Sequence, residues 1–118
     1  MSQVSTKLRC GDGMYSHWCP GCDEMHYIPT DMDDRPRWSF NGNVESPTFN
    51  PSVRIRGKQT IKVDGKWTGE WVRDASGNPV DGCCHYFLHN GMLEFCSDTT
   101  HRFAGQRVPL PDIPRFGD

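Results

Sequence analysis

The stretch around Asn90-Gly91 constrains the fold more than any other part of the chain. Two runs rich in aromatic and aliphatic residues flank this dipeptide, which is the strongest short-range signal of a β-hairpin. A two-residue turn there places His85 opposite Cys96, whereas a three-residue loop pairs Cys84 with Cys96. In either register, thiols, imidazoles and a carboxylate crowd the hairpin and its exit. We therefore expect this segment to carry the chemistry of the protein.

Length and composition indicate one compact antiparallel β domain spanning residues 1–118. The chain has 118 residues, 35% of them hydrophobic, with twelve glycines and nine prolines, which favours short strands and turns over long helices. The fold class is therefore mostly β, with a small α+β arrangement as the alternative. The net charge of -2 offers no basic field for nucleic acid. No apolar run approaches the roughly 18 residues of a membrane span, and no signal peptide is recognisable, so we expect a cytoplasmic protein.

Local patterns predict where the strands lie. Alternating apolar and polar residues predict half-buried strands at 53–56 and 60–63, and a turn at Asp64-Gly65 leads into another strand. Pro47 and Pro51 are expected to exclude a helix or central strand from residues 44–52 and to leave a rigid extended segment. Further short strands are expected at 15–18, 27–29, 38–43 and 67–72, with a single helical turn at most at 100–104 and an extended tail at 107–114.

The cysteines point to a metal site. Six cysteines in a chain without a recognisable leader are expected to be metal ligands or free thiols, with inert buried cysteines as the alternative. Cys19-Pro20-Gly21-Cys22 has the pattern of a zinc knuckle, and a redox dithiol is its competitor. Nothing next to Cys10 or Cys83 completes a site. The candidate ligands of one structural Zn²⁺, in a zinc-ribbon-like arrangement, are Cys19, Cys22, His26, Cys84 and Cys96.

The remaining polar side chains include the parts of a hydrolytic site. Ser52, His85, Asp98 and His101 supply a hydroxyl, two imidazoles and a carboxylate, which can serve as nucleophile, general base and orienting acid. A stiff proline-rich segment is a suitable mount for the hydroxyl, although a serine there is by default only a turn former. A catalytic zinc held by the histidines is the alternative, but no dedicated motif supports it.

With these motifs in view, the chain resembles a family of small proteins from phages, prophages and bacteria. That family is catalogued as a domain of unknown function, is often mislabelled ammonia monooxygenase, and is related to peptidase-like domains of bacterial operons that resemble ubiquitin conjugation. The matching blocks span nearly the whole chain: Cys19-Pro20-Gly21-Cys22 with His26, Trp38-Ser39-Phe40-Asn41-Gly42, Pro47-Thr48-Phe49-Asn50-Pro51-Ser52, Cys84-His85-Tyr86-Phe87, and Asp98-Thr99-Thr100-His101 with Val108-Pro109-Leu110-Pro111.

The resemblance implies a serine hydrolase that acts on a ubiquitin-like or other host protein, in the host cytoplasm if a phage encodes it. Ser52 would attack, His85 or His101 would take its proton, and Asp98 would orient the imidazole. Backbone amides of residues 47–52 would stabilise the oxyanion. Relatives commonly carry a cysteine in place of Thr99, which leaves Cys96 and His26 in competition for the fourth metal position.

A non-catalytic zinc-ribbon module that binds a host protein, for example to antagonise a defence system, is the alternative function. Its anchoring patch would consist of exposed aromatic side chains, and these same residues could instead build the core of a domain poor in aliphatics. The sequence does not determine which histidine is the base, and it identifies neither the substrate nor the oligomeric state. The candidate patch residues are Tyr15, Trp18, Trp38, Trp67 and Trp71.

Overall fold

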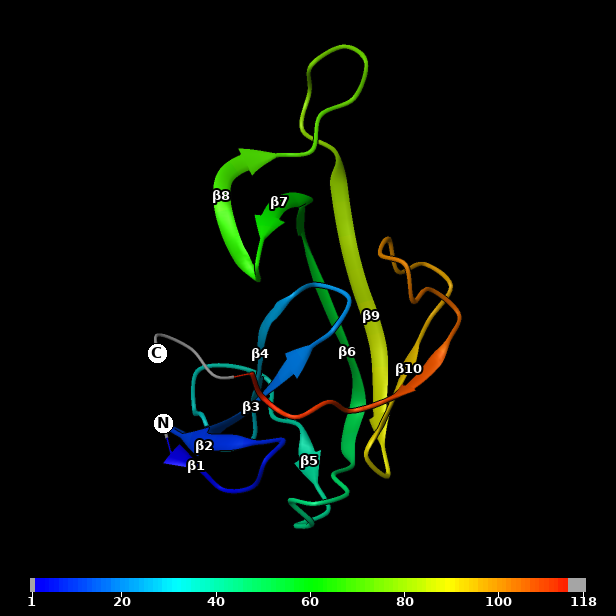
Figure 1. Ribbon diagram of the computed structural model, residues 1–118. Helices are drawn as coiled ribbons and strands as arrows, with labels where there is room; N and C mark the ends of the chain where they lie inside the picture. Colours follow the sequence, from blue (N-terminus) through cyan, green and yellow to red (C-terminus); the bar gives the residue numbers. More distant parts are fainter. Residues whose placement is uncertain (1, 115–118) are drawn as a thin grey trace.

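A computed structural model describes residues 2–114 of the protein, and this part of the chain consists of strands and loops without a helix (Figure 1). The prediction of a mostly β protein is therefore confirmed. The same residues contain no helix that could cross a membrane. The strands are β1 (Ser2–Gln3), β2 (Arg9–Gly11), β3 (Met14–Cys19), β4 (Glu24–Pro29), β5 (Ser39–Phe40), β6 (Phe49–Lys58), β7 (Thr60–Val63), β8 (Lys66–Trp71), β9 (Asp81–His89), β10 (Met92–Phe95) and β11 (Arg107–Pro109).

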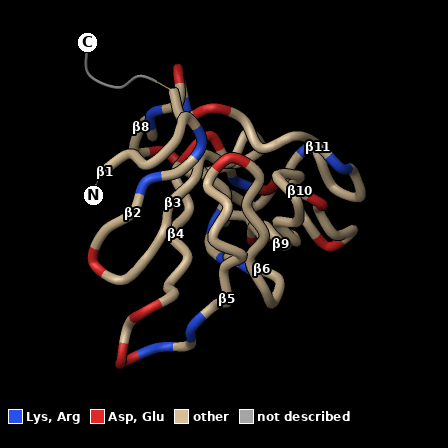
Figure 2. The backbone as a smooth tube through the Cα atoms, turned by 90° about the horizontal axis from the view of Figure 1, so that it is seen from below, with Lys and Arg blue, Asp and Glu red and all other residues tan. Residues whose placement is uncertain are grey.

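Three antiparallel sheets organise these strands. The largest has the order β11-β10-β9-β6-β5, the second has the order β1-β2-β3-β4, and β7 and β8 form a two-stranded hairpin. In Figure 1 the long strands β6 and β9 run side by side, with the β7–β8 hairpin at their upper end. Acidic and basic residues are interspersed along the chain (Figure 2). The core joins the two larger sheets and includes Leu8, Ile28, Phe49, Val53, Tyr86, Leu88, Leu93, Phe95 and Leu110.

The β9–β10 hairpin has the two-residue turn. Met92 pairs with His89, and the N–H of Cys96 donates to the carbonyl oxygen of His85 at 2.8 Å. Asn90 and Gly91 both adopt positive φ, at 50° and 73°, as a tight hairpin turn requires. His85 therefore lies opposite Cys96, as the first of the two sequence-derived registers predicts.

The prediction that prolines exclude residues 49–52 from a central strand is wrong. β6 begins at Phe49 and lies between β5 and β9. The ladder with β9 shifts between Phe49 and Val53, so this stretch of β6 contains a bulge. A bulge tolerates Pro51 because its missing N–H is not needed for the ladder. The extra residues also place Ser52 at this irregular part of the sheet.

Successive side chains of β9 point to opposite faces of the sheet. Cys84 and Tyr86 are buried on the inner face, whereas His85 and Phe87 point to the outer face. Beyond β10 the chain continues beside β9, since the N–H of Thr100 donates to the carbonyl oxygen of Cys83 at 2.8 Å. Each of the segments 84–85 and 98–101 therefore places side chains on both faces of this sheet.

Candidate active site and metal centre

Ser52, His85 and Asp98 form a hydrogen-bonded series on the outer face of the five-stranded sheet. His85 Nε2 lies 3.2 Å from Ser52 Oγ, and His85 Nδ1 lies 3.0 and 3.2 Å from the two carboxylate oxygens of Asp98. Because an ionised carboxylate only accepts hydrogen bonds, the network assigns the proton to Nδ1 and leaves Nε2 to accept from Ser52. In this tautomer a histidine can take the proton of a serine nucleophile.

Two further side chains hold this series in place. Thr99 is buried, and its hydroxyl accepts from the N–H of His85 at 3.0 Å and donates to the carbonyl oxygen of the same residue at 2.9 Å. Thr99 adjoins Asp98, so these bonds tie the carboxylate to β9. Arg54 pairs with His85 across β6 and β9, and its guanidinium lies 3.8 Å from Asp98.

The structure places His101 away from Ser52. Its Nε2 lies 3.4 Å from Cys84 Sγ, and its ring packs edge-on against Phe95 with centroids 4.5 Å apart. Of the two histidines that the sequence offered as the base, the structure brings His85 to the serine.

A second cluster of reactive groups lies on the inner face. Cys19, Cys22, His26 and Cys84 each offer one ligand atom, and these atoms all lie within 4.8 Å of one another. The six cysteines of the chain are free thiols. Cys96 lies outside this cluster and groups instead with His85 and Asp98. Three sulfur donors and one imidazole in a closed, mostly buried site are compatible with a structural metal ion.

The hydrogen bonds of Tyr86 determine which nitrogen of His26 faces the cluster as an acceptor. His17 Nδ1 lies 3.1 Å from the carbonyl oxygen of Trp18 and must donate to it, so His17 Nε2 accepts from the Tyr86 hydroxyl at 2.6 Å. The Tyr86 oxygen then accepts from His26 Nδ1 at 3.1 Å. His26 Nε2 is consequently unprotonated, and it is buried without a hydrogen-bond partner among the described residues. Such an atom fits a metal ligand oriented by an outer hydrogen bond.

His101 has the opposite tautomer. The N–H of Phe103 donates to His101 Nδ1 at 3.2 Å, so a neutral His101 carries its proton on Nε2, which faces Cys84 Sγ. This arrangement suits a hydrogen-bond donor to a thiolate. His26 can therefore offer the lone pair of Nε2 to a cation, whereas the Nε2 of a neutral His101 carries a proton and cannot.

The thiols of the cluster ionise unequally. Hydrogen bonds from Cys22 and Cys84 lower the pKa of Cys19, whereas the same contacts and burial raise the pKa of Cys22 to about 12 and raise that of Cys84. A divalent cation held by these sulfurs would favour the thiolate form of all three, because a coordinating thiol is deprotonated.

Comparison with known proteins identifies the family. A model of the bacterial ubiquitination-like system serine protease family (BubE) matches residues 2–96. The chain belongs to the BubE family. The relation drawn from the motifs is therefore confirmed. The matched part of this BubE protein includes Ser52 and His85 and ends before Asp98 and His101. No curated protein and no solved structure matches the chain significantly.

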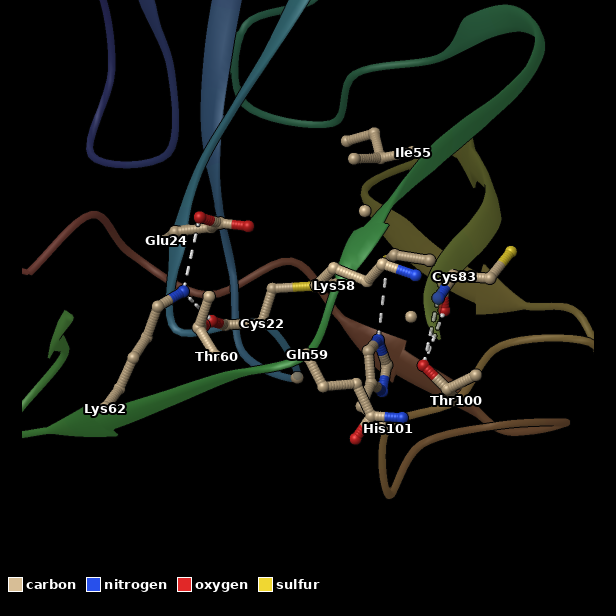
Figure 3. Close-up of a pocket in the computed structure, with 14 residues that line it drawn as sticks. Cys22, Glu24, Ile55, Lys58, Gln59, Thr60, Lys62, Cys83, Thr100 and His101 are labelled. Carbon is tan, nitrogen blue, oxygen red and sulfur yellow. Dashed lines mark hydrogen bonds and ion pairs between the residues drawn. The ribbon is translucent and has the colours of Figure 1, made fainter. Parts of the chain in front are cut away.

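A pocket of about 190 Å³, whose lining residues are drawn in Figure 3, adjoins the cysteine cluster of this BubE protein through Cys22 and Cys84. Cys22, Cys84 and His101 line it together with parts of β6, β7 and β9, whereas Ser52, His85 and Asp98 do not. Beside the pocket, Lys62 Nζ donates to the carbonyl oxygen of Cys22 at 2.6 Å and pairs with Glu24 at 3.2 Å (Figure 3). Lys62 of β7 thereby links the β7–β8 hairpin to the segment that carries Cys22 and Glu24.

Several supporting residues of the BubE site escaped the sequence analysis. Arg54 and His17 stand in none of the motifs considered, and Tyr86 and Thr99 stand in matching blocks but were given no role of their own. One signal was available: a hairpin that pairs Cys19 with Glu24 also pairs His17 with His26, which brings two histidines side by side. The aromatic patch is reduced, because Trp67 and Trp71 are exposed but Trp18 is buried, and Tyr15 and Trp38 pack against the core.

We expect the metal-free protein to lose stability as the pH falls from about 6.5 to about 4. Burial lowers the pKa of His26 from 6.5 to about 4 and lowers that of His17. Within this range the unfolded chain binds more protons than the folded one, so acid favours unfolding. At about 1.4 kcal/mol per pKa unit, His26 contributes roughly 3 kcal/mol, fully present above pH 6.5. Thermal melts across this range test the prediction, and a midpoint that does not change with pH would contradict it.

Proposed function

We propose that this BubE protein is a serine peptidase built on a zinc-stabilised β domain. The observation that carries the proposal is the series Ser52–His85–Asp98, whose distances and tautomer match a nucleophile, base and orienting acid. Ser52 Oγ attacks the scissile carbonyl carbon while His85 Nε2 accepts its proton, and Asp98 stabilises the imidazolium. The same proton passes to the leaving amine as the C–N bond breaks. Water then attacks the acyl carbon while His85 takes its proton, the bond from that carbon to Ser52 Oγ breaks, and His85 returns the proton to Ser52 Oγ.

Zinc would serve structure in this protein. Cys19, Cys22, Cys84 and His26 would supply four N and S donors, the number that a closed structural zinc site takes without an open position for a catalytic water. His101 would donate from Nε2 to the Cys84 thiolate as an outer partner. Bound zinc would stabilise the fold by linking the knuckle to β9.

The metal centre and the triad would depend on each other through the chain. Cys84 and His85 are neighbours in β9, and Asp98 and His101 lie in one short segment that Thr99 and Thr100 bind to β9. A ligand and its outer partner therefore adjoin the base and the acid of the triad. Loss of the metal should loosen both segments and misplace the triad.

The bulge in β6 supports a role in oxyanion binding. Residues 50–52 have no register partner in β9, Asn50 pairs with Ser39 of β5, and Pro51 has no N–H, so the amide of Ser52 is the candidate in this stretch to face the substrate rather than a ladder. Family membership supports a protein substrate, and the ubiquitin-like protein of a bacterial ubiquitination-like system is the substrate we propose.

A cleavage assay tests this function. A ubiquitin-like protein from such a system, fused through its C terminus to a reporter protein, is incubated with the zinc-loaded enzyme and analysed by mass spectrometry. We expect hydrolysis at one bond near the junction. An intact fusion that still binds the protein would instead favour the alternative of a non-catalytic binding module.

Asp98→Asn should reduce the cleavage rate on the order of 10⁴-fold, because an amide no longer secures the correct tautomer of the base. Asp98 is partly exposed, so the variant should fold and retain its zinc. Asp81→Asn is a matched control, since Asp81 is also an exposed aspartate in an ion pair, with Lys58. Equal rates for Asp98→Asn and the unmodified enzyme would remove Asp98 from the triad.

A further inference from the structure

Cys96 is a thiol that neither the triad nor the inner cluster uses. Cys96 directly follows β10 and lies opposite His85. Its sulfur makes no hydrogen bond among the described residues. Its sulfur, one ring nitrogen of His85 and a carboxylate oxygen of Asp98 all lie within 4.8 Å of one another. A thiol, an imidazole and a carboxylate from two chain segments thus meet around His85, the proposed general base.

We propose that His85, Cys96 and Asp98 form a second, surface metal site that takes Zn²⁺ and switches the peptidase off. The inhibitory part rests on the proposed serine peptidase function, whereas the metal site stands on the geometry alone. Two ligands of a tetrahedral zinc lie roughly 3.3–3.8 Å apart when the metal–ligand bonds are about 2.0–2.3 Å. The His85–Asp98 separation of 3.0–3.2 Å is close to this range, so small side-chain adjustments suffice.

The charges and donor types suit zinc. A deprotonated Cys96 and an ionised Asp98 supply two negative charges, and His85 supplies a neutral imidazole, so a bound Zn²⁺ is neutralised. Binding releases one proton, that of the Cys96 thiol, to solvent. Arg54, 3.8 Å from Asp98, is the cation that the metal would partly displace. The fourth position is left to water or Ser52 Oγ.

Occupation of this site would block catalysis whichever ring nitrogen binds. Zinc on His85 Nε2 removes the atom that accepts the Ser52 proton. Zinc on Nδ1 displaces the proton to Nε2, which then donates to Ser52 and cannot act as a base. The surface site has one thiolate and partial exposure, whereas the inner cluster has three sulfurs and is more buried. Zinc should therefore fill the inner cluster first and inhibit only in excess.

The first test measures the rate at which a fluorophosphonate probe labels the zinc-loaded protein as Zn²⁺ is added. We expect labelling to slow, and to recover when EDTA removes only the excess metal. Cys96→Ser should label normally without added zinc, and its half-inhibiting zinc concentration should rise by at least the 10–100-fold that loss of even an outer-shell partner costs. Cys10→Ser, a cysteine of the other sheet, should respond like the unmodified protein.

A second test does not depend on activity. Co²⁺ is added to the protein whose inner cluster already holds zinc, and near-ultraviolet thiolate-to-cobalt absorption is recorded. Absorption that appears in the unmodified protein and is absent from Cys96→Ser supports the site. Absence of this absorption, or equal zinc inhibition of Cys96→Ser and the unmodified protein, overturns the proposal. If the unmodified protein neither labels nor cleaves, the peptidase function fails, while cobalt still decides whether the metal site exists.

Discussion

Replacing Ser52 by alanine should lower the cleavage rate of the ubiquitin-like fusion on the order of 10⁶-fold. This effect is the largest we expect, because the variant removes the oxygen that forms the acyl intermediate and no other hydroxyl lies on His85 Nε2 among the described residues. The Ser52 side chain is half-buried and its Oγ bonds only to His85, so the fold should persist. Product formation by the two proteins at equal zinc content measures the change.

Ser46→Ala is the matched control for this experiment. Ser46 lies in the same proline-rich part of the chain and is also half-buried, but it has no contact with His85. Its cleavage rate should equal that of the unmodified enzyme. Substantial cleavage by Ser52→Ala would show that another group is the nucleophile.

Replacing Cys84 by serine should have the second-largest effect, on metal content and stability together. Cys84 is 3% exposed and is the candidate ligand through which the proposed metal would link β9 to the knuckle. Metal binding at structural zinc sites is worth about 10–16 kcal/mol at pH 7, and much of this should be lost with one of four ligands. Elemental analysis should show zinc falling from one equivalent toward none, with a much lower melting temperature.

Cys83→Ser offers a control one residue away. Cys83 lies on the same strand but outside the inner cluster, so its replacement should leave one zinc per chain and an unchanged melting temperature. Two variants with the same zinc content and the same melting behaviour would contradict a metal centre built on Cys84.

Features that depend on local chemistry could be predicted from the sequence. The turn at Asn90-Gly91 is favoured by those two residues alone, and alternation placed the strands around Val53 and Ile61 correctly. The bulge that admits Pro51 could not be predicted, because it is defined by the ladder with β9, a strand about thirty residues away in sequence.

In the candidate site, too, local chemistry could be predicted from the sequence, whereas contacts between distant segments could not. Residue chemistry was enough to single out Ser52, Asp98 and the cysteines of the knuckle. It could not choose between His85 and His101, because the choice depends on which face of the sheet each residue occupies. The sequence likewise left Cys96 and His26 in competition, and the structure puts His26 with the inner cysteines and Cys96 with His85.

The central claim is that Ser52 is a nucleophile activated by His85 on a metal-organised fold. Labelling with a fluorophosphonate, followed by mass spectrometry of the intact protein and its peptides, tests it most directly. We predict one covalent adduct per chain, located on Ser52, in protein that retains its zinc. A folded, zinc-loaded protein that forms no adduct, or forms it on another residue, would contradict the account.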